Sequence, residues 1–160
     1  GIAAATRTAA ALLAAFAIGQ AIALWAGYFG VVRVPSQWAS VALALSVFAI
    51  AWNNLRPFAG RRAPAIVGFM GACHGLAMSG ALANMALPTR SRVVALGGFH
   101  LGVELAMLVV CVLALPVWFA ASRSRFYPRV VMGVGSLAIA WMAVVWVLER
   151  AFSLALFAGR

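Results

Sequence analysis

Charged residues divide this sequence into stretches long enough to cross a lipid bilayer. A helix needs about 20 apolar residues to span the hydrocarbon core. Five stretches reach that length with no charge or a single one: those between Arg7 and Arg33, Arg33 and Arg56, Arg62 and Arg90, Arg92 and Arg123, and Arg129 and Glu149. We therefore predict an all-α fold, a polytopic bundle of five transmembrane helices at about residues 8–31, 37–56, 65–87, 93–120 and 130–149.

The composition agrees with a chain whose solvent is lipid. Hydrophobic residues make up 66% of the sequence and charged residues 9%, against about 25% charged in soluble domains. The mean hydropathy is +1.06. The spacing leaves no separate soluble segment, so a single integral membrane domain is predicted to cover residues 1–160, with the lipid bilayer as its first partner.

The basic residues are all arginine, and they gather where the predicted helices end. The net charge of +10 comes from clusters such as RPFAGRR, LPTRSR and SRSRFYPR. Arginines at these places anchor helices at lipid headgroups, so nucleic-acid binding is not predicted. Alternating helices put seven arginines on one side of the membrane and five on the other. The positive-inside rule makes the seven-arginine side the cytoplasmic one.

Three ionisable side chains are predicted near the middle of the bilayer. His74 is central in the third span, and His100 and Glu104 lie four residues apart in the fourth, on one face of a helix. A carboxylate at this depth costs about 2.5–3.5 kcal/mol on insertion scales, so its default interpretation is a functional site.

Stripes of small residues predict how the third and fourth helices pack. Gly71, Gly75 and Ser79 follow each other at four-residue spacing in one helix, and Gly98 and Gly102 do so in the next. Such stripes let two helices approach closely in lipid. We therefore expect these two helices to pack together.

That packing would bring His74, His100 and Glu104 together. Imidazole and carboxylate ligands suit a borderline divalent cation such as nickel, cobalt or zinc. Gln20, Asn53 and Asn54 are the predicted supporting polar residues.

Other interpretations of the same residues stay open. His100 and Glu104 could form a hydrogen-bonded pair that only fixes helix rotation, or a proton relay. Methionines near these residues could line a Cu(I) path, although methionine more often fills gaps in a core. Haem ligation by His74 and His100 is not favoured, because Glu104 lies on the same helix face as His100. The sequence lacks aspartate and a G-x-S-x-G motif, so no enzyme is predicted.

Four runs of sequence together resemble the HupE/UreJ family of small membrane proteins, in the second of its two sequence groups. These are RVPSQWASVALALSVFAIAWNNL, GFMGACHGLAMSGALANMALP, ALGGFHLGVELAML and GSLAIAWMAVVWVLER. The positions of His74, Glu104, Asn54 and Glu149 match the family pattern directly. The resemblance implies a multi-pass protein of the bacterial inner membrane that handles nickel or cobalt.

The chain also departs from the pattern of that family. Members usually begin with a helix bearing a His…Asp-His motif, which this sequence does not contain. Gln20 stands where members tend to have histidine, and His100 stands where they tend to have asparagine. Either the metal site has been rebuilt around His74, His100 and Glu104, or the scaffold has been kept without transport.

Two functions follow. The first is a divalent-metal permease with a diverged site, whose cargo is nickel or cobalt. The second is a structural or accessory subunit of a larger membrane complex, or of a homo-oligomer, that offers its lipid-facing surface to a partner.

Overall fold

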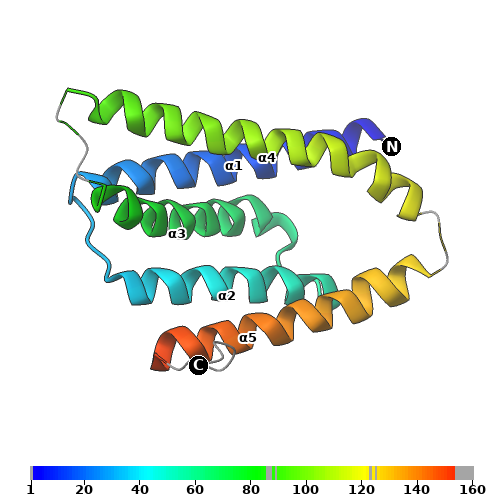
Figure 1. Ribbon diagram of the computed structural model, residues 1–160. Coiled ribbons are helices and arrows are strands. Elements are labelled where there is room, and N and C mark those ends of the chain that lie inside the picture. Colours follow the sequence, from blue (N-terminus) through cyan, green and yellow to red (C-terminus); the bar gives the residue numbers. More distant parts are fainter. Residues whose placement is uncertain (1, 86–87, 89, 123, 125, 154–160) are drawn as a thin grey trace.

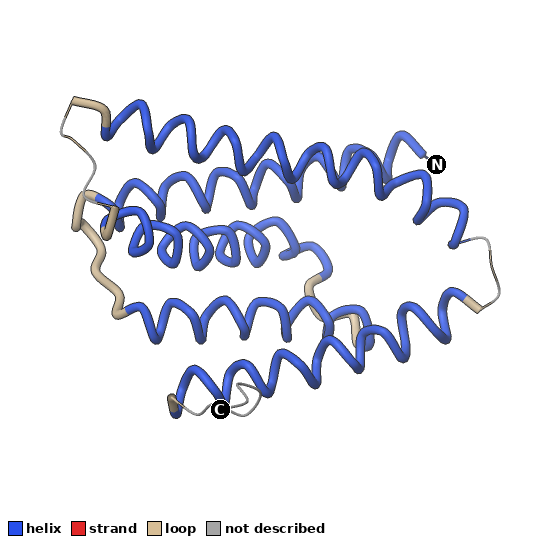
Figure 2. Tube along the Cα trace, in the orientation of Figure 1, coloured by secondary structure: helices blue, strands red, loops and turns tan. Residues whose placement is uncertain are grey.

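The structure is a computed structural model that describes residues 2–85, 88, 90–122, 124 and 126–153 of the chain. Its long helices are α1 (Ile2–Tyr28), α2 (Ser36–Leu55), α3 (Ala63–Ala83), α4 (Arg92–Ser122) and α5 (Ser136–Phe152) (Figure 1). The described part of the chain contains no strand (Figure 2). The predicted all-α class is thus confirmed.

Five helical spans are long and apolar enough to cross a membrane: Thr6–Tyr28, Ser36–Leu55, Gly60–Ala83, Arg92–Ala121 and Val130–Phe152. They fall where the charge spacing predicts them. The last span differs in kind, because its first turns, Pro128–Gly135, are π-helical and the α-helix begins at Ser136. The change from π-helix to α-helix could not be predicted from hydropathy, because the sequence is apolar both before and after Ser136.

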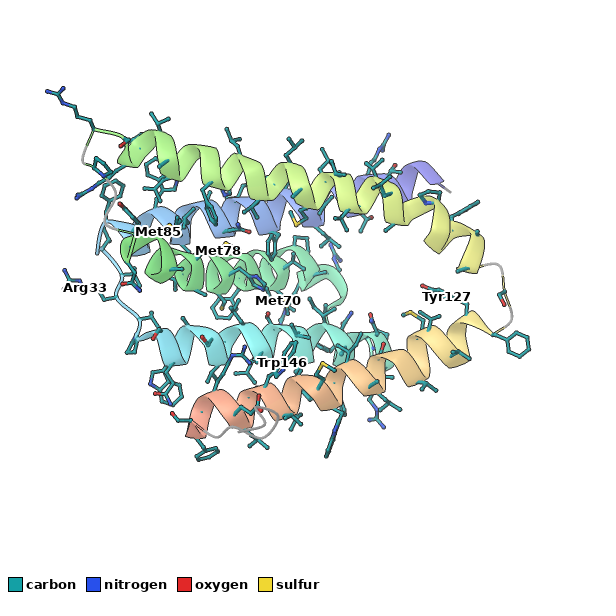
Figure 3. The ribbon with its side chains drawn as sticks, viewed as in Figure 1. Arg33, Met70, Met78, Met85, Tyr127 and Trp146 are labelled. Carbon is teal, nitrogen blue, oxygen red and sulfur yellow. The ribbon has the colours of Figure 1, made fainter. Side chains whose placement is uncertain are left out.

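The helices alternate in direction and associate as two pairs. α1 packs along α3, α2 packs along α5, and contacts between α2 and α3 join the pairs (Figure 1). Arg33, between α1 and α2, and Tyr127, before α5, mark opposite ends of the molecule (Figure 3). The N-terminus and the α2–α3 connection lie at the Tyr127 end. Successive helices therefore run in opposite directions between the two ends.

Glycine sets the distance between α1 and α3. A Cβ atom on Gly71 would overlap the carbonyl oxygen of Phe16, and one on Gly75 would overlap that of Gln20. On the facing helix, a Cβ on Gly19 would overlap the Gly68 carbonyl oxygen. These two backbones touch each other directly, which is the close approach that small residues permit in lipid.

The expected close pairing of the third and fourth helices is wrong. Gly71, Gly75 and Ser79 pack against α1, while Gly98 and Gly102 in α4 have no atom within 4 Å of an added Cβ. Within the described residues, α4 instead lies along α1 and meets α3 at one end. A small-residue stripe indicates that a helix can be approached closely, but it does not identify the approaching helix. In this bundle that helix is α1, which offers glycines of its own.

Hydrogen bonds at both ends hold the second pair together. The Asn54 amide donates to the Ser136 hydroxyl at 3.3 Å. At the opposite end, the Gln37 amide donates to the carbonyl groups of Arg150 and Ala151, at 3.0 Å each. The second set satisfies carbonyls that the end of α5 would otherwise leave unpaired.

The turn after α2 is held by a side chain. The Asn53 carbonyl oxygen accepts hydrogen bonds from the Phe58 and Ala59 amides at 3.1 and 3.0 Å. Gly60 then adopts φ +47°, a left-handed conformation that favours glycine. The chain can thus reverse in a few residues and enter α3.

Candidate functional site

Within the described residues, His100 and Glu104 approach each other at membrane depth without completing an ion pair. Their Nδ1 and Oε1 atoms lie 4.0 Å apart, and the side chains are 16% and 21% exposed. That distance is beyond hydrogen-bonding range. Both atoms are buried and have no hydrogen-bond partner. The pair is therefore placed on one helix face, as its spacing predicts, but its polar atoms are not satisfied.

Glu104 of this pair borders a groove between α1 and α4. The groove has a volume of about 220 Å³ and is lined by Leu13, Ala14, Ala17, Glu104, Met107 and Leu108. Glu104 is its one charged member. An apolar groove with a single carboxylate at mid-helix can hold a cation, a proton or water at that carboxylate, and it offers little to an anion.

Gln20 supplies a third unsatisfied polar atom on the same side of the bundle. Its side chain is completely buried. The amide nitrogen lies 3.6 Å from the Met78 sulfur, and Figure 3 shows Met78 on α3. The carbonyl oxygen Oε1 has no partner. A buried acceptor without a donor costs about 1–3 kcal/mol of folding free energy. This oxygen is therefore available to a bound ligand.

The helix register places Gln20 opposite His100. Leu24 and Leu96 share one apolar cluster, and further along Ala17 and Glu104 line the same groove. Gln20 is four residues from Leu24, and His100 is four residues from Leu96 on the antiparallel helix. One turn of helix separates each pair, so Gln20 and His100 occupy the same level. We call the line formed by Gln20, His100 and Glu104 the α1–α4 seam.

His74 lies at a similar depth but on another face. Its neighbour Gly75 packs on the Gln20 backbone, whereas its own ring meets Phe16 edge-on at 5.2 Å between centroids. Its Nε2 atom is 3.4 Å from the Ser46 hydroxyl of α2. That hydroxyl donates to the Leu43 carbonyl at 2.7 Å, so its oxygen is free to accept a hydrogen bond from Nε2–H. The neutral ring with its proton on Nε2 fits this arrangement.

The expected convergence of His74 with His100 and Glu104 is not found. In the part of the chain that the structure describes, no three His, Cys, Asp or Glu side chains gather closely enough to hold a metal ion. The cause is the packing described above, since α3 turns its small residues toward α1 and His74 toward α2. A metal-binding role for any one of the three side chains stays a prediction.

Asn53 and Asn54 were expected to support the site, and the structure places them at the end of α2. Asn53 holds the turn before α3, and Asn54 joins α2 to α5. Sequence reasoning missed the α1 wall of the groove, made by Leu13, Ala14 and Ala17. No sequence signal marks them, because α1 is apolar on every side.

The fold and the site together define a class. The chain is a multi-pass helical membrane protein with a histidine–carboxylate pair at mid-depth. The family model described as HupE / UreJ protein matches residues 2–150, so the chain belongs to the HupE/UreJ family, as its sequence runs predict. Members are generally nickel- or cobalt-transporter-like membrane proteins and are not known as enzymes. No curated protein and no solved structure matches the chain.

Proposed function

We propose that this protein is a permease for a divalent cation of the nickel and cobalt class, and that the cation passes mid-depth at His100 and Glu104. The observation that supports this most directly is the unsatisfied pair beside the groove. A carboxylate and an imidazole nitrogen match the ligand preference of these metals. Membership of the family supports the same cargo.

The site has few protein ligands, which suits transport. A permeating ion must bind well enough to enter and weakly enough to leave. Waters in the groove would complete the coordination shell of the ion. Because the imidazole must be neutral and the carboxyl ionised to bind metal, protons compete and uptake weakens as pH falls.

Uptake by proteoliposomes that contain the purified chain tests this function. Glu104→Gln keeps the size of the side chain and removes its charge, so we expect uptake of radioactive nickel or cobalt to be lost. Glu149→Gln, at the end of α5 and away from the groove, is the matched control and should retain uptake. Size-exclusion profiles must stay equal across the set. Full uptake by Glu104→Gln would exclude the role assigned to this residue.

The same assay locates the contribution of His74. We expect His74→Gln to retain uptake, because the ring faces Ser46 and Phe16 and not the groove. Loss of uptake without loss of assembly would place His74 on the path of the ion.

A non-transporting accessory subunit is the second candidate. The observation that favours it is the exposed side of α4, where Gly98 and Gly102 face open space. Small residues left unpacked on a transmembrane helix can receive another helix. Stoichiometric co-purification with a larger complex, together with no uptake by the wild-type chain, would replace the permease proposal with this one.

A further inference from the structure

Among the long helices, α4 is the least attached to the bundle. Among the side chains that the structure describes, none in its most apolar stretch is buried. Added Cβ atoms at Gly97, Gly98 and Gly102 would meet nothing within 4 Å. By contrast, α1 and α3 touch backbone to backbone, and α2 and α5 share hydrogen bonds. In lipid, packing and hydrogen bonds hold helices together, so α4 is the helix with the least to hold it.

Two contacts of α4 lie on either side of His100. At one, Leu96 and Phe99 pack with Leu24 and Leu82. At the other, Glu104 and the residues after it line the groove against α1. His100 lies between these two places, level with Gln20. The α1–α4 seam is thus where a ligand could act on the position of α4.

Unsatisfied buried atoms occur on both helices at this level. Within the described residues, the buried side-chain nitrogen and oxygen atoms without a hydrogen-bond partner are Oε1 of Gln20, Nδ1 of His100 and Oε1 of Glu104. Gln20 belongs to α1, and the other two belong to α4. An orphan on one helix alone would be a local defect. Unsatisfied atoms on both helices at one depth can all be satisfied by one bridging group.

We propose that the transported cation binds across the seam, between Gln20 of α1 and His100 and Glu104 of α4, and draws α4 onto the α1–α3 pair. This inference rests on the proposed function and adds the third ligand and the moving element. Gln20 contributes a neutral oxygen, His100 a nitrogen and Glu104 the charge. Adjacent ligands at about 2.0–2.2 Å from one ion lie roughly 3.0–3.5 Å apart. The 4.0 Å separation of His100 and Glu104 therefore needs to close only slightly.

Binding of Co²⁺ to the purified full-length chain, measured by equilibrium dialysis, tests the third ligand. We expect Gln20→Leu to weaken Co²⁺ binding by about 10-fold or more, as loss of a metal partner does elsewhere. Gln37→Leu, on α2 and outside the seam, is the control and should bind as the wild type does. Gln20→Glu keeps the shape and adds a charge, so it should tighten binding, and it remains informative if the leucine variant fails to fold.

The outcomes separate this inference from the function on which it rests. Unchanged Co²⁺ affinity in both Gln20 variants, with uptake lost in Glu104→Gln, would overturn the bridging role and leave the permease proposal standing. Retained uptake in Glu104→Gln would overturn passage of the cation at this carboxylate, and absence of uptake by the wild-type chain would overturn the permease proposal itself. Affinity lost in Gln20→Leu and gained in Gln20→Glu would support the bridge.

The movement of α4 has its own readout. Spin labels at Phe69 of α3 and Leu105 of α4 sit on exposed positions, in a background where both cysteines are replaced. Diamagnetic Zn²⁺ serves as the probe ion. We expect the label-to-label distance distribution to become shorter and narrower with Zn²⁺, and Gln20→Leu to abolish that change. Equal distributions with and without Zn²⁺ would contradict docking of α4 by the ion.

Discussion

Gly71 shows how one missing side chain fixes the spacing of two helices. The carbonyl oxygen of Phe16 occupies the place where a Cβ atom would be. The residue is buried in the α1–α3 contact. Even the smallest side chain here must push the two backbones apart along their whole contact, because neighbouring glycines touch in the same way.

We expect Gly71→Ala to destabilise the protein by about 1–3 kcal/mol, the usual cost of overpacking a tight contact. Gly98→Ala is the matched control, since its added methyl group meets open space. The measurement is unfolding in mixed micelles by titration with a denaturing detergent. Equal midpoints for the two variants would contradict the backbone contact between α1 and α3.

At the scale of helices, the α2–α5 pair depends on polar contacts that lipid makes difficult to replace. Ser136 is buried at 2% exposure, and its hydroxyl accepts the Asn54 amide at 3.3 Å. Interhelical hydrogen bonds of this kind contribute about 0.6 kcal/mol on average and up to about 1.7 kcal/mol.

A double-mutant cycle measures the contribution of this contact. We expect Asn54→Leu to lower the free energy of unfolding more in the wild-type protein than in a Ser136→Ala background. In the wild-type protein the change leaves a buried hydroxyl without its partner, whereas in the Ser136→Ala background that hydroxyl is already gone. The coupling free energy from detergent unfolding should be about 0.5–1.5 kcal/mol. Additive costs, with no coupling, would show that the two side chains do not interact in the folded protein.

The helices themselves were predictable from sequence, while their partners were not. Charge spacing located each span because arginine is costly inside lipid, and that rule acts on each helix separately. Partner choice depends on surface shape, and α1 and α3 are apolar all round, so no polar face marks the side toward a neighbour. Gly71 and Gly75 predicted a close contact correctly and could not say with which helix. Gln20 was predicted only as a supporting residue, because its level opposite His100 follows from the α1–α4 register.

At the scale of the whole molecule, the arginines are unevenly distributed between the two ends. Arg7, near the start of α1, and Arg56, Arg61 and Arg62, between α2 and α3, belong to segments at the end marked by Tyr127. Arg33 and Arg92 are among those at the other end. The alternation of the five helices thus agrees with the division of arginines between the two membrane sides, from which the orientation was predicted.

Labelling with a membrane-impermeant maleimide tests that orientation in intact cells. Phe58 and Val31 are exposed residues in connections at opposite ends, and each can be changed to cysteine in a background without Cys73 and Cys111. We expect Val31→Cys to be labelled from outside and Phe58→Cys only after the cells are permeabilised, as the positive-inside rule requires. The reverse pattern would contradict the predicted orientation.

The pairing of α1 with α3 and of α2 with α5 has a consequence for how the chain is made. Helices enter the membrane in sequence order and associate afterwards. When α1 and α2 have left the ribosome, neither has its main partner, and the backbone contact of α1 forms only once α3 has been inserted past α2. The main contact of α2 waits for α5. Nascent chains stopped before α5 should therefore remain open to quality-control proteases until α5 pairs with α2.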